Sequence, residues 1–251
     1  MNVCLSTNRR PLKRLKMKKT SCESCESSCL IQKYCSPEWV RKMDQIKCQL
    51  FFKQNQDIVN ENSPILGGFF VQSGKVKIYS TGLNQRQQIV RFANPGHIIG
   101  HRGAEKERYP IGAKAMDDSV VCFIENKVLD ELFEGNPKFV QELMKFYSRE
   151  LRKIENRMKN LGQMNTREKI SEALLLMWEN FGLTEQNELN VPFTREDIAN
   201  IAGTNAEQVM KQLTEFEQEG FISKAGRKIE ILNLEGLKNI IKKYNQHTIL
   251  A

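Results

Sequence analysis

The sequence predicts an α+β chain in which a small β-roll is followed by a long helix and a C-terminal winged helix-turn-helix. Residues 50–125 contain short apolar runs separated by Gly, Pro and Asn, a pattern typical of a small all-β domain. From residue 136, apolar residues recur at steps of three and four, which predicts a long helix. Residues 194–231 carry capping signals for two helices and then a hairpin pattern. A chain of 251 residues is long enough for two compact domains.

Positive charge is concentrated at the N-terminus. Residues 1–20 hold seven Lys and Arg residues and no acid, which accounts for nearly all of the formal net charge of +8. We expect this segment to be a disordered basic tail, and the excess charge favours an anionic partner such as nucleic acid. No apolar run approaches the roughly 20 residues of a membrane span, and no signal-peptide core is present. We therefore expect a cytoplasmic protein with no membrane contact.

Residues 50–135 are expected to form the β-roll. Residues 67–79 read as a strand, a Ser-Gly turn and a second strand, because apolar side chains alternate with lysines after the turn. Residues 88–92 predict a further strand. Residues 119–124 predict the strand that closes the roll, and this strand carries Cys122.

Residues 136–162 predict one long helix, which begins with a proline in its first turn. The apolar residues that follow have the spacing of a parallel coiled-coil seam, and charged residues fill the other faces. Such a seam packs against a second copy of itself, so we expect a homodimer. Packing of the seam on the chain's own β-domain is the alternative. The expected dimer contacts are Val140, Tyr147, Leu151, Ile154 and Met158.

Residues 163–251 predict the winged helix-turn-helix domain. Thr194 is expected to cap a short helix, with Asp197 at the reciprocal position of a capping box. A glycine turn follows, and Thr204 is expected to cap a second helix. Residues 221–231 then predict the β-hairpin that forms the wing.

The second helix is expected to enter a major groove of DNA. Its apolar stripe faces the first helix, so polar side chains near its N-terminus turn outward, where they match donors and acceptors on base edges. Basic residues of the wing suit phosphates. A plain solvated helix face is the alternative for the polar residues. The expected DNA contacts are Thr194, Thr204, Asn205, Glu207, Gln208, Lys211, Lys224, Arg227 and Lys228.

Four of the seven cysteines lie within fourteen residues, in the spacing Cys22-x2-Cys25-x3-Cys29-x5-Cys35, and Cys122 lies much further along the chain. Clustered thiols without an export signal favour an iron–sulfur cluster or zinc over a disulfide framework. A structural zinc site would use the four clustered cysteines and leave Cys122 as an ordinary strand residue. Unliganded thiols are the third alternative.

The order of β-roll, long helix and winged helix-turn-helix resembles the Crp/Fnr family of bacterial regulators over residues 20–240. The motifs that carry this resemblance are Ser73-Gly74-Lys75-Val76-Lys77, Pro95-Gly96-His97-Ile98-Ile99-Gly100 and Thr194-Arg195-Glu196-Asp197-Ile198-Ala199. The resemblance implies a β-roll of cyclic-nucleotide-binding type. It also implies a homodimeric, sequence-specific regulator of transcription that binds a palindromic operator in double-stranded DNA and has RNA polymerase as a partner.

The Fnr branch is the most similar, because Ser119-Val120-Val121-Cys122 matches the place where that branch keeps an internal cluster-binding cysteine. Together with three N-terminal cysteines, that residue holds an oxygen-labile [4Fe–4S] cluster in the branch. The resemblance therefore implies residues 21–49 as a sensor segment and a response to oxygen or redox state. A regulator without a cluster that responds to another small molecule is the alternative. The implied cluster ligands are Cys25, Cys29, Cys35 and Cys122, with Cys22 as an alternate.

Two other kinds of site are not expected. Cyclic nucleotide is not expected as the effector, because His101-Arg102-Gly103 stands where family members that bind it commonly have Gly-Glu. Residues 109–113 also lack the phosphate-gripping arginine, for which Arg102 or Arg108 is the alternative. An enzyme is not expected, because the three histidines are scattered and no Ser-His-Asp or P-loop spacing is present. Cys4 and Cys48 have no spacing partner and are expected to be plain thiols.

Overall fold

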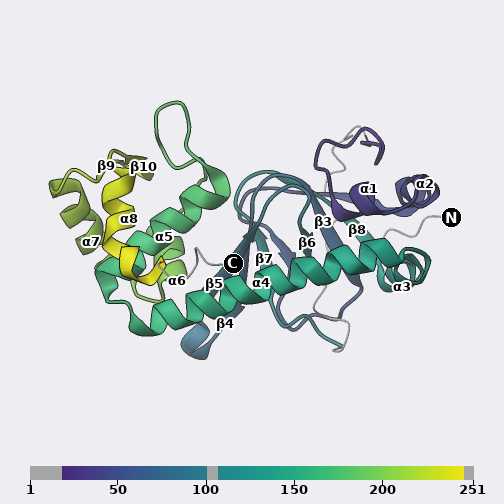
Figure 1. The fold of residues 1–251 in the computed structure, drawn as a ribbon, viewed down its shortest axis with the longest axis horizontal. Coiled ribbons are helices and arrows are strands. Elements are labelled where there is room, and N and C mark those ends of the chain that lie inside the picture. Colours follow the sequence, from purple (N-terminus) through teal and green to yellow (C-terminus); the bar gives the residue numbers. More distant parts are fainter. Residues whose placement is uncertain (1–18, 101–106, 246–251) are drawn as a thin grey trace. The chain divides into compact units, whose positions relative to one another are not determined.

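The computed structural model describes residues 19–100 and 107–245 (Figure 1). The expected basic tail therefore lies almost entirely outside the described residues. The chain divides into two compact units. The first contains residues up to Val76 together with Ala93–Tyr147, and the second contains Lys77–Phe92 together with the residues from Ser148 onward. Within the described ranges, no helix combines the length and the apolar character needed to span a membrane.

The first unit begins with two helices in the Cys-rich segment, α1 (Leu30–Tyr34) and α2 (Pro37–Ile46). The side chain of Ser36 caps α2 by accepting a hydrogen bond from the backbone N–H of Trp39, and the first helical residue is proline. These are the usual signals of a helix start. A third helix, α3 (Asn126–Gly135), follows the β-roll.

The β-roll contains two four-stranded sheets, with the strand orders β1-β8-β3-β6 and β2-β7-β4-β5. In the first sheet, β8 pairs antiparallel with β1 and β3, and Cys122 lies opposite Gln49 and Phe70. Side chains alternate along a strand, so Val120, Cys122 and Ile124 share one face of β8. The strands are β1 (Cys48–Phe52), β2 (Asp57–Val59), β3 (Gly67–Ser73), β4 (Val76–Thr81), β5 (Gln87–Ala93), β6 (Ile98–Ile99), β7 (Gly112–Ala115) and β8 (Ser119–Glu125), with a 3-10 turn at Leu83–Gln85.

One hydrophobic core joins the Cys-rich segment to the β-roll. It contains residues of α1, α2, α3, β3, β6, β8 and the start of α4 (Pro137–Gln163). Each large apolar side chain buried in this way contributes roughly 1.5–3 kcal/mol to stability. This core holds α1 and α2 against β3 and β8, and Figure 1 shows the helices beside these strands. Cys122 packs against the same core. Its buried members are Ile31, Met43, Phe70, Ile98, Ile124, Leu129, Leu132, Phe139 and Leu143.

Gly67 lies where β3 pairs with β8 and has no room for a side chain. A Cβ at this position would lie 2.0 Å from the carbonyl oxygen of Ile124. That oxygen belongs to the strand ladder and cannot move without disturbing it. We expect Gly67→Ala to lower the free energy of unfolding by about 1–3 kcal/mol, the usual cost of overpacking a core. Urea unfolding checks this. Gly82→Ala is the control, because its Cβ would meet no atom closer than 3.7 Å, and equal midpoints for the two variants would contradict the expectation.

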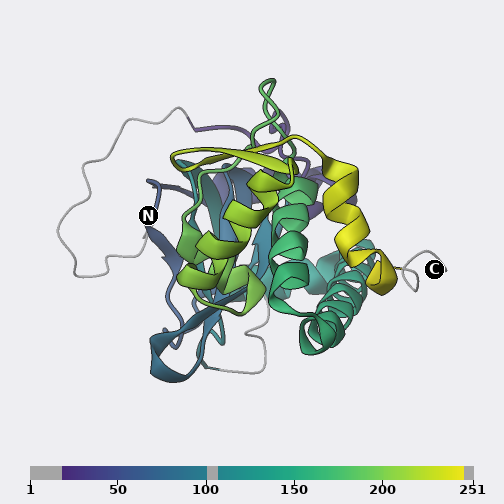
Figure 2. The ribbon, with the colours of Figure 1, turned by 90° about the vertical axis from the view of Figure 1, so that its left-hand side faces the viewer.

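The C-terminal part of the second unit combines helices with a small hairpin. Strand β9 pairs antiparallel with β10, and Lys224 lies opposite Ile229. Figure 2 shows α8, in yellow, beside α5, in green. The elements are α5 (Thr166–Phe181), α6 (Arg195–Ala202), α7 (Ala206–Gln218), β9 (Ile222–Ala225), β10 (Lys228–Ile231) and α8 (Leu234–Asn245). This is the helix-turn-helix and wing that the sequence predicts.

Candidate functional site: cysteine pocket and helix-turn-helix

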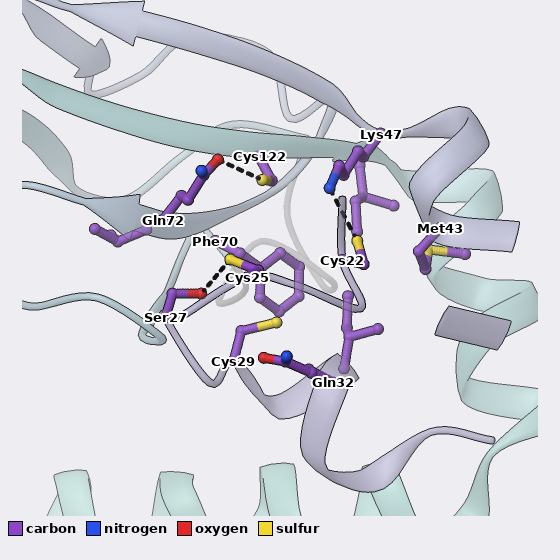
Figure 3. Close-up of a pocket in the computed structure, with 13 residues that line it drawn as sticks. Cys22, Cys25, Ser27, Cys29, Gln32, Met43, Lys47, Phe70, Gln72 and Cys122 are labelled. Atoms are coloured by element: carbon purple, nitrogen blue, oxygen red, sulfur yellow. Dashed lines mark hydrogen bonds between the residues drawn. The ribbon is translucent and has the colours of Figure 1, made fainter. Parts of the chain in front are cut away.

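Four cysteines of the first unit surround one pocket, which is drawn in Figure 3. Cys22, Cys25 and Cys29 come from the segment before α1, and Cys122 comes from β8. The pocket contains about 430 Å³ of empty space, part of it continuous with solvent. Soft sulfur donors inside a mostly apolar wall suit iron–sulfur clusters or zinc. The other lining residues are Ser27, Ile31, Gln32, Met43, Lys47, Phe70, Val71, Gln72 and Ile124.

Cys35, which the sequence predicts as a ligand, is not among the residues that line this pocket in the described part of the chain. Cys29 is the N-cap of α1 and Cys35 is its C-cap. A helix rises about 1.5 Å per residue, so the two cysteines are about 9 Å apart along its axis. Cys35 packs against the hydrophobic core instead, and the pocket brings in the alternate, Cys22.

Cys48 is expected from the sequence to be a plain thiol, but this is wrong, because it is disulfide-bonded. Cys4 lies outside the described residues. The five other cysteines are free thiols, namely Cys22, Cys25, Cys29, Cys35 and Cys122.

Burial raises the pKa of three thiols of the pocket, those of Cys22, Cys29 and Cys122, and so favours their neutral form. It raises the pKa of Cys122 to about 12. Burial also raises the pKa of Cys29, although the backbone N–H groups of Gln32 and Ile31 favour its thiolate. Buried neutral thiols are weak nucleophiles, whereas coordination to a metal deprotonates them. Within residues 19–100 and 107–245, no three His, Cys, Asp or Glu side chains lie close enough together to hold a single metal ion.

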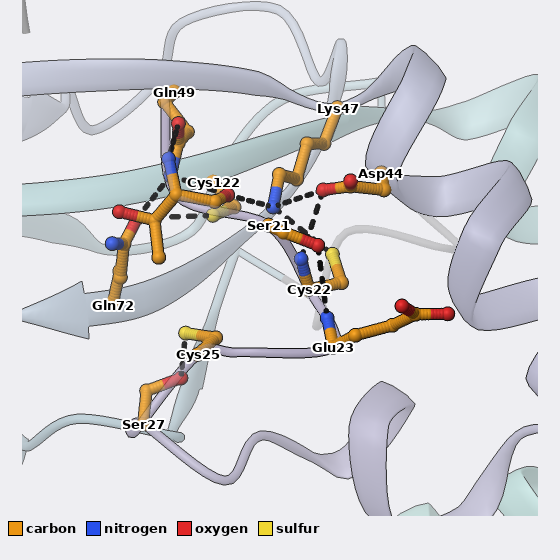
Figure 4. A network of polar contacts seen from close by, with 11 residues as sticks. Ser21, Cys22, Glu23, Cys25, Ser27, Asp44, Lys47, Gln49, Gln72 and Cys122 are labelled. Carbon is orange, nitrogen blue, oxygen red and sulfur yellow. Dashed lines mark hydrogen bonds and ion pairs between the residues drawn. The ribbon is translucent and has the colours of Figure 1, made fainter. Parts of the chain in front are cut away.

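A buried lysine contacts the first pocket cysteine, as Figure 4 shows. Lys47 is 4% exposed, and its ammonium donates to Cys22 Sγ at 3.0 Å and to the carbonyl oxygen of Thr20 at 2.7 Å. It also pairs with Asp44 Oδ1 at 2.9 Å, and the same oxygen accepts a hydrogen bond from the backbone N–H of Cys22 at 2.8 Å. Burial alone would lower the pKa of Lys47, but the hydrogen bonds to Cys22 and Asp44 outweigh it and raise the pKa. Lys47 is therefore charged at neutral pH.

Neutral polar side chains complete the wall of the pocket. Cys25 Sγ lies 3.1 Å from Ser27 Oγ. The Cys122 thiol donates a long hydrogen bond, 3.7 Å, to Gln72 Oε1. The Oε1 atom of Gln32 is buried and has no hydrogen-bond partner among the described residues. A buried polar atom without a partner is uncommon, and this oxygen, as an acceptor, would be satisfied only by a hydrogen-bond donor.

Helices α6 and α7 form the helix-turn-helix of the second unit. The Thr194 side chain accepts a hydrogen bond from the Asp197 N–H at 3.1 Å, and Asp197 accepts one from the Thr194 N–H at 2.8 Å. This is the predicted capping box. Gly203 ends α6 at φ 64°, a left-handed conformation that favours glycine. The N-cap of α7 is Asn205 rather than the expected Thr204, because the Asn205 side chain accepts the hydrogen bond from the Gln208 N–H.

Helix α7 has one buried face and one polar face. Val209, Leu213 and Phe216 are fully buried. The side chains of Glu207, Gln208 and Lys211 are exposed. These three lie near the N-terminus of the helix, where a recognition helix presents side chains to base edges.

The wing places its three basic residues differently. Arg227 and Lys228 are exposed at the hairpin turn, and Lys228 pairs with Glu188 at 2.7 Å. Lys224 folds back onto α7, where it donates to Thr214 Oγ1 at 2.9 Å and pairs with Glu217 at 3.0 Å. To contact a DNA phosphate, Lys224 would have to leave Thr214 and Glu217.

Helix α4 carries an exposed apolar row. Met144, Leu151 and Met158 are 61%, 57% and 71% exposed and are spaced at intervals of seven residues. Leu143 is buried in the core of the first unit, so Met144 is the residue that continues the row. Exposed apolar residues repeating in this way are typical of a helix that packs on a partner. The other predicted members, Val140, Tyr147 and Ile154, are half-buried.

Comparison with known proteins agrees with this architecture. Residues 168–240 match the Crp-like helix-turn-helix domain, and residues 49–136 match the cyclic nucleotide-binding domain. The chain is 31% identical over 184 residues to the transcriptional activator protein anr of Pseudomonas aeruginosa, which covers 72% of this chain and 75% of that protein. It is 28% identical over 199 residues to the anaerobic regulatory protein of Haemophilus influenzae, which covers 78% of this chain and 75% of that protein.

Among solved structures, FixK2 from Bradyrhizobium japonicum shares the fold, with a TM-score of 0.67 and 24% sequence identity. The similarity covers 78% of this chain and 97% of that chain. The described architecture and the curated relatives identify a transcription regulator and not an enzyme. The chain belongs to the Crp/Fnr family of transcription regulators, in its Fnr-like branch.

Proposed function

We propose that this chain is a homodimeric, sequence-specific DNA-binding regulator that responds to oxygen or redox state through a [4Fe–4S] cluster. The proposal rests on the convergence of Cys22, Cys25, Cys29 and Cys122 on one pocket. Three cysteines near the N-terminus and one internal cysteine make up this set. The name of one relative, the anaerobic regulatory protein, supports a role in the response to oxygen, and the name of another, the transcriptional activator protein anr, supports control of transcription.

The donor set fits the cluster. Four cysteine thiolates hold a [4Fe–4S] cluster, one on each iron, so the sulfurs surround the cluster rather than meet at one ion. Such a cluster with four thiolates is anionic. The Lys47 ammonium, the charged group of the pocket wall, would stabilise that negative charge. When bound, the cluster would supply a centre that senses oxygen or redox state. The role of the chain is to hold it and to limit its contact with water.

A structural zinc site is the second candidate. Zinc would use Cys22, Cys25, Cys29 and Cys35, and all four sulfurs would lie about 2.3 Å from one ion. The positions of Cys29 and Cys35 at opposite ends of α1 do not favour this set, because α1 would have to unwind for the two to meet. The set that includes Cys122 requires no such change.

Dimerisation through α4 would place two α7 helices on successive major grooves, about 34 Å apart, which is the geometry for a palindromic operator. We propose that cluster binding favours this dimer and that cluster loss weakens DNA binding. The protein would act in the cytoplasm together with RNA polymerase. Cyclic nucleotide is not part of the proposal, and the segment on which that expectation rests, His101-Arg102-Gly103, lies outside the described residues.

Anaerobic purification followed by metal analysis tests the cluster. We expect about four iron and four acid-labile sulfide atoms per chain and a brown colour. About one zinc per chain would instead support the structural zinc site. Iron-free, zinc-free and colourless protein would support a regulator of this family that works without a metal.

Gln208 provides a test of DNA recognition. Its side chain is exposed. A glutamine amide can pair with adenine, and loss of one such contact costs about 1–3 kcal/mol. The proposed dimer carries the substitution in both half-sites, so we expect Gln208→Ala to weaken binding to the preferred operator by about 30-fold or more and to relax specificity at one position of each half-site. Gln218→Ala, at the opposite end of α7, is the control and is expected to leave binding unchanged. Fluorescence anisotropy at fixed salt measures both. Equal operator affinities for the two variants would show that Gln208 does not contact a base.

A further inference from the structure

Lys47 is buried to a degree that is unusual for a lysine, since its side chain is 3% exposed. It is the C-cap residue of α2, and its backbone N–H bonds to the carbonyl oxygen of Met43, so the end of the helix fixes the start of its side chain. An ammonium group has three donors. All three have acceptors here, namely Cys22 Sγ, the Thr20 carbonyl oxygen and Asp44 Oδ1.

The charge of Lys47 faces the pocket. Of the residues that line the pocket, Lys47 is the one with a charged side chain. Its partner, Asp44, is not part of the lining, and its side chain is 32% exposed. Solvent therefore screens the carboxylate more than the ammonium. A group bound in the pocket is therefore exposed mainly to the positive charge of Lys47, which lies at hydrogen-bond distance from the Cys22 sulfur.

A cluster held by four thiolates is anionic, and one added electron increases its negative charge. Cluster potentials depend on net charge, on hydrogen bonds to the sulfurs and on solvent exposure. An ammonium that donates to a ligand sulfur stabilises the reduced form more than the oxidised form. It also holds that sulfur in place against the metal.

We infer that Lys47 is a positioning residue of the cysteine pocket, which holds the Cys22 thiolate on the cluster and raises the reduction potential of the cluster. This inference rests on the proposed function, because it concerns the same bound group. It adds a fifth residue to the site, one that is not a ligand. Lys47 would thereby influence how readily this protein keeps its cluster.

The test compares the full-length protein with Lys47→Met and Lys47→Gln, all loaded with cluster anaerobically. Lys47→Met removes the donor and the charge, whereas Lys47→Gln keeps a donor for Cys22 or Thr20 and removes the charge. Lys42→Gln is the control, because Lys42 also belongs to α2 but is 44% exposed and pairs with Glu131. Two quantities are measured without oxygen. They are the midpoint potential of the cluster, with an electrode as the electron source, and the rate of iron transfer to a chelator.

We expect a lower midpoint potential for both Lys47 variants and no change for Lys42→Gln. For Lys47→Met we also expect about tenfold faster iron transfer, the factor that loss of one charge-assisted hydrogen bond gives. A merely structural role for Lys47 would not move the potential of Lys47→Gln.

The outcomes separate this inference from the proposed function. If the unaltered protein holds no iron, the proposed function fails. If it holds the cluster and both Lys47 variants keep its midpoint potential, the inference is overturned and the proposed function stands. If all variants fold but neither Lys47 variant assembles a cluster while Lys42→Gln does, the role of Lys47 in holding the Cys22 thiolate on the cluster is supported.

Discussion

Replacing Cys122 with serine is expected to remove the iron from anaerobically purified protein, from about four atoms per chain to nearly none. Serine is close to cysteine in size, but its hydroxyl is a poor ligand for iron–sulfur clusters, which select soft thiolates. Cys122 is held rigidly, because β8 pairs on both sides with β1 and β3. Among the described residues that line the pocket, it is the one cysteine that a strand supplies. The same loss is expected for serine at Cys22, Cys25 and Cys29.

Cys35→Ser is the matched control for these variants and is expected to keep its iron. Cys35 is the C-cap of α1 and does not line the pocket in the described residues. Iron and acid-labile sulfide analysis, with circular dichroism to confirm folding, measures all five variants. Loss of iron from Cys35→Ser together with retention of iron by Cys22→Ser would contradict the ligand set proposed from the pocket. It would support the set expected from the sequence, which contains Cys35 in place of Cys22.

Leu151→Glu is expected to convert the proposed dimer to monomer at micromolar concentration. Leu151 is 57% exposed and lies at the centre of the apolar row on α4, between Met144 and Met158. A two-fold interface contains the substitution twice. Loss of two leucine contacts at roughly 1.5 kcal/mol or more each weakens dimerisation at least about a hundredfold, and two buried carboxylates add to this. Specific DNA binding should fall with it, because each half-site needs its own recognition helix.

Leu232→Glu is the control for the dimer test. Leu232 is 55% exposed, almost the same as Leu151, but it follows the wing rather than belonging to α4. Sedimentation equilibrium measures the oligomeric state of both variants. A Leu151→Glu protein that remains dimeric would place the dimer interface elsewhere.

The sequence predicts best the elements whose pattern is local and repeated. The long helix is predicted at residues 136–162 and spans Pro137–Gln163. The closing strand is predicted at residues 119–124 and spans Ser119–Glu125. The apolar spacing repeats over several turns of the helix, and the strand is one unbroken apolar run, so the hydrophobic pattern alone identifies both elements. The cap of α7 is displaced by one residue from the prediction, because Thr204 and Asn205 are both good N-caps and local sequence does not choose between them.

Which cysteines line the pocket is harder to predict, because their grouping depends on a short helix. A five-residue helix such as α1 is unstable by itself and depends on tertiary packing, here the burial of Ile31 in the core. From spacing alone the segment is taken as a loop, in which Cys35 could reach the other cysteines as easily as Cys22 could. Once α1 forms, Cys29 and Cys35 are held apart.

Lys47 has no signal in the sequence at all. Its partner Cys22 lies 25 residues away, and the pairing depends on how α2 ends over the Cys-rich segment. A lysine at the end of a helix is ordinarily solvent-exposed. The burial of Lys47 beside the Cys22 thiol can be recognised only from the packed structure.

The most direct test of the account is the affinity of the protein for a selected palindromic operator before and after exposure to air, at one salt concentration, with iron counted in parallel. The account predicts that the iron-loaded dimer binds tightly. It also predicts that loss of iron in air weakens binding by about 5–150-fold, the usual range of coupling between two sites. Equal affinity before and after air, in a protein that carries no iron in either state, would contradict it.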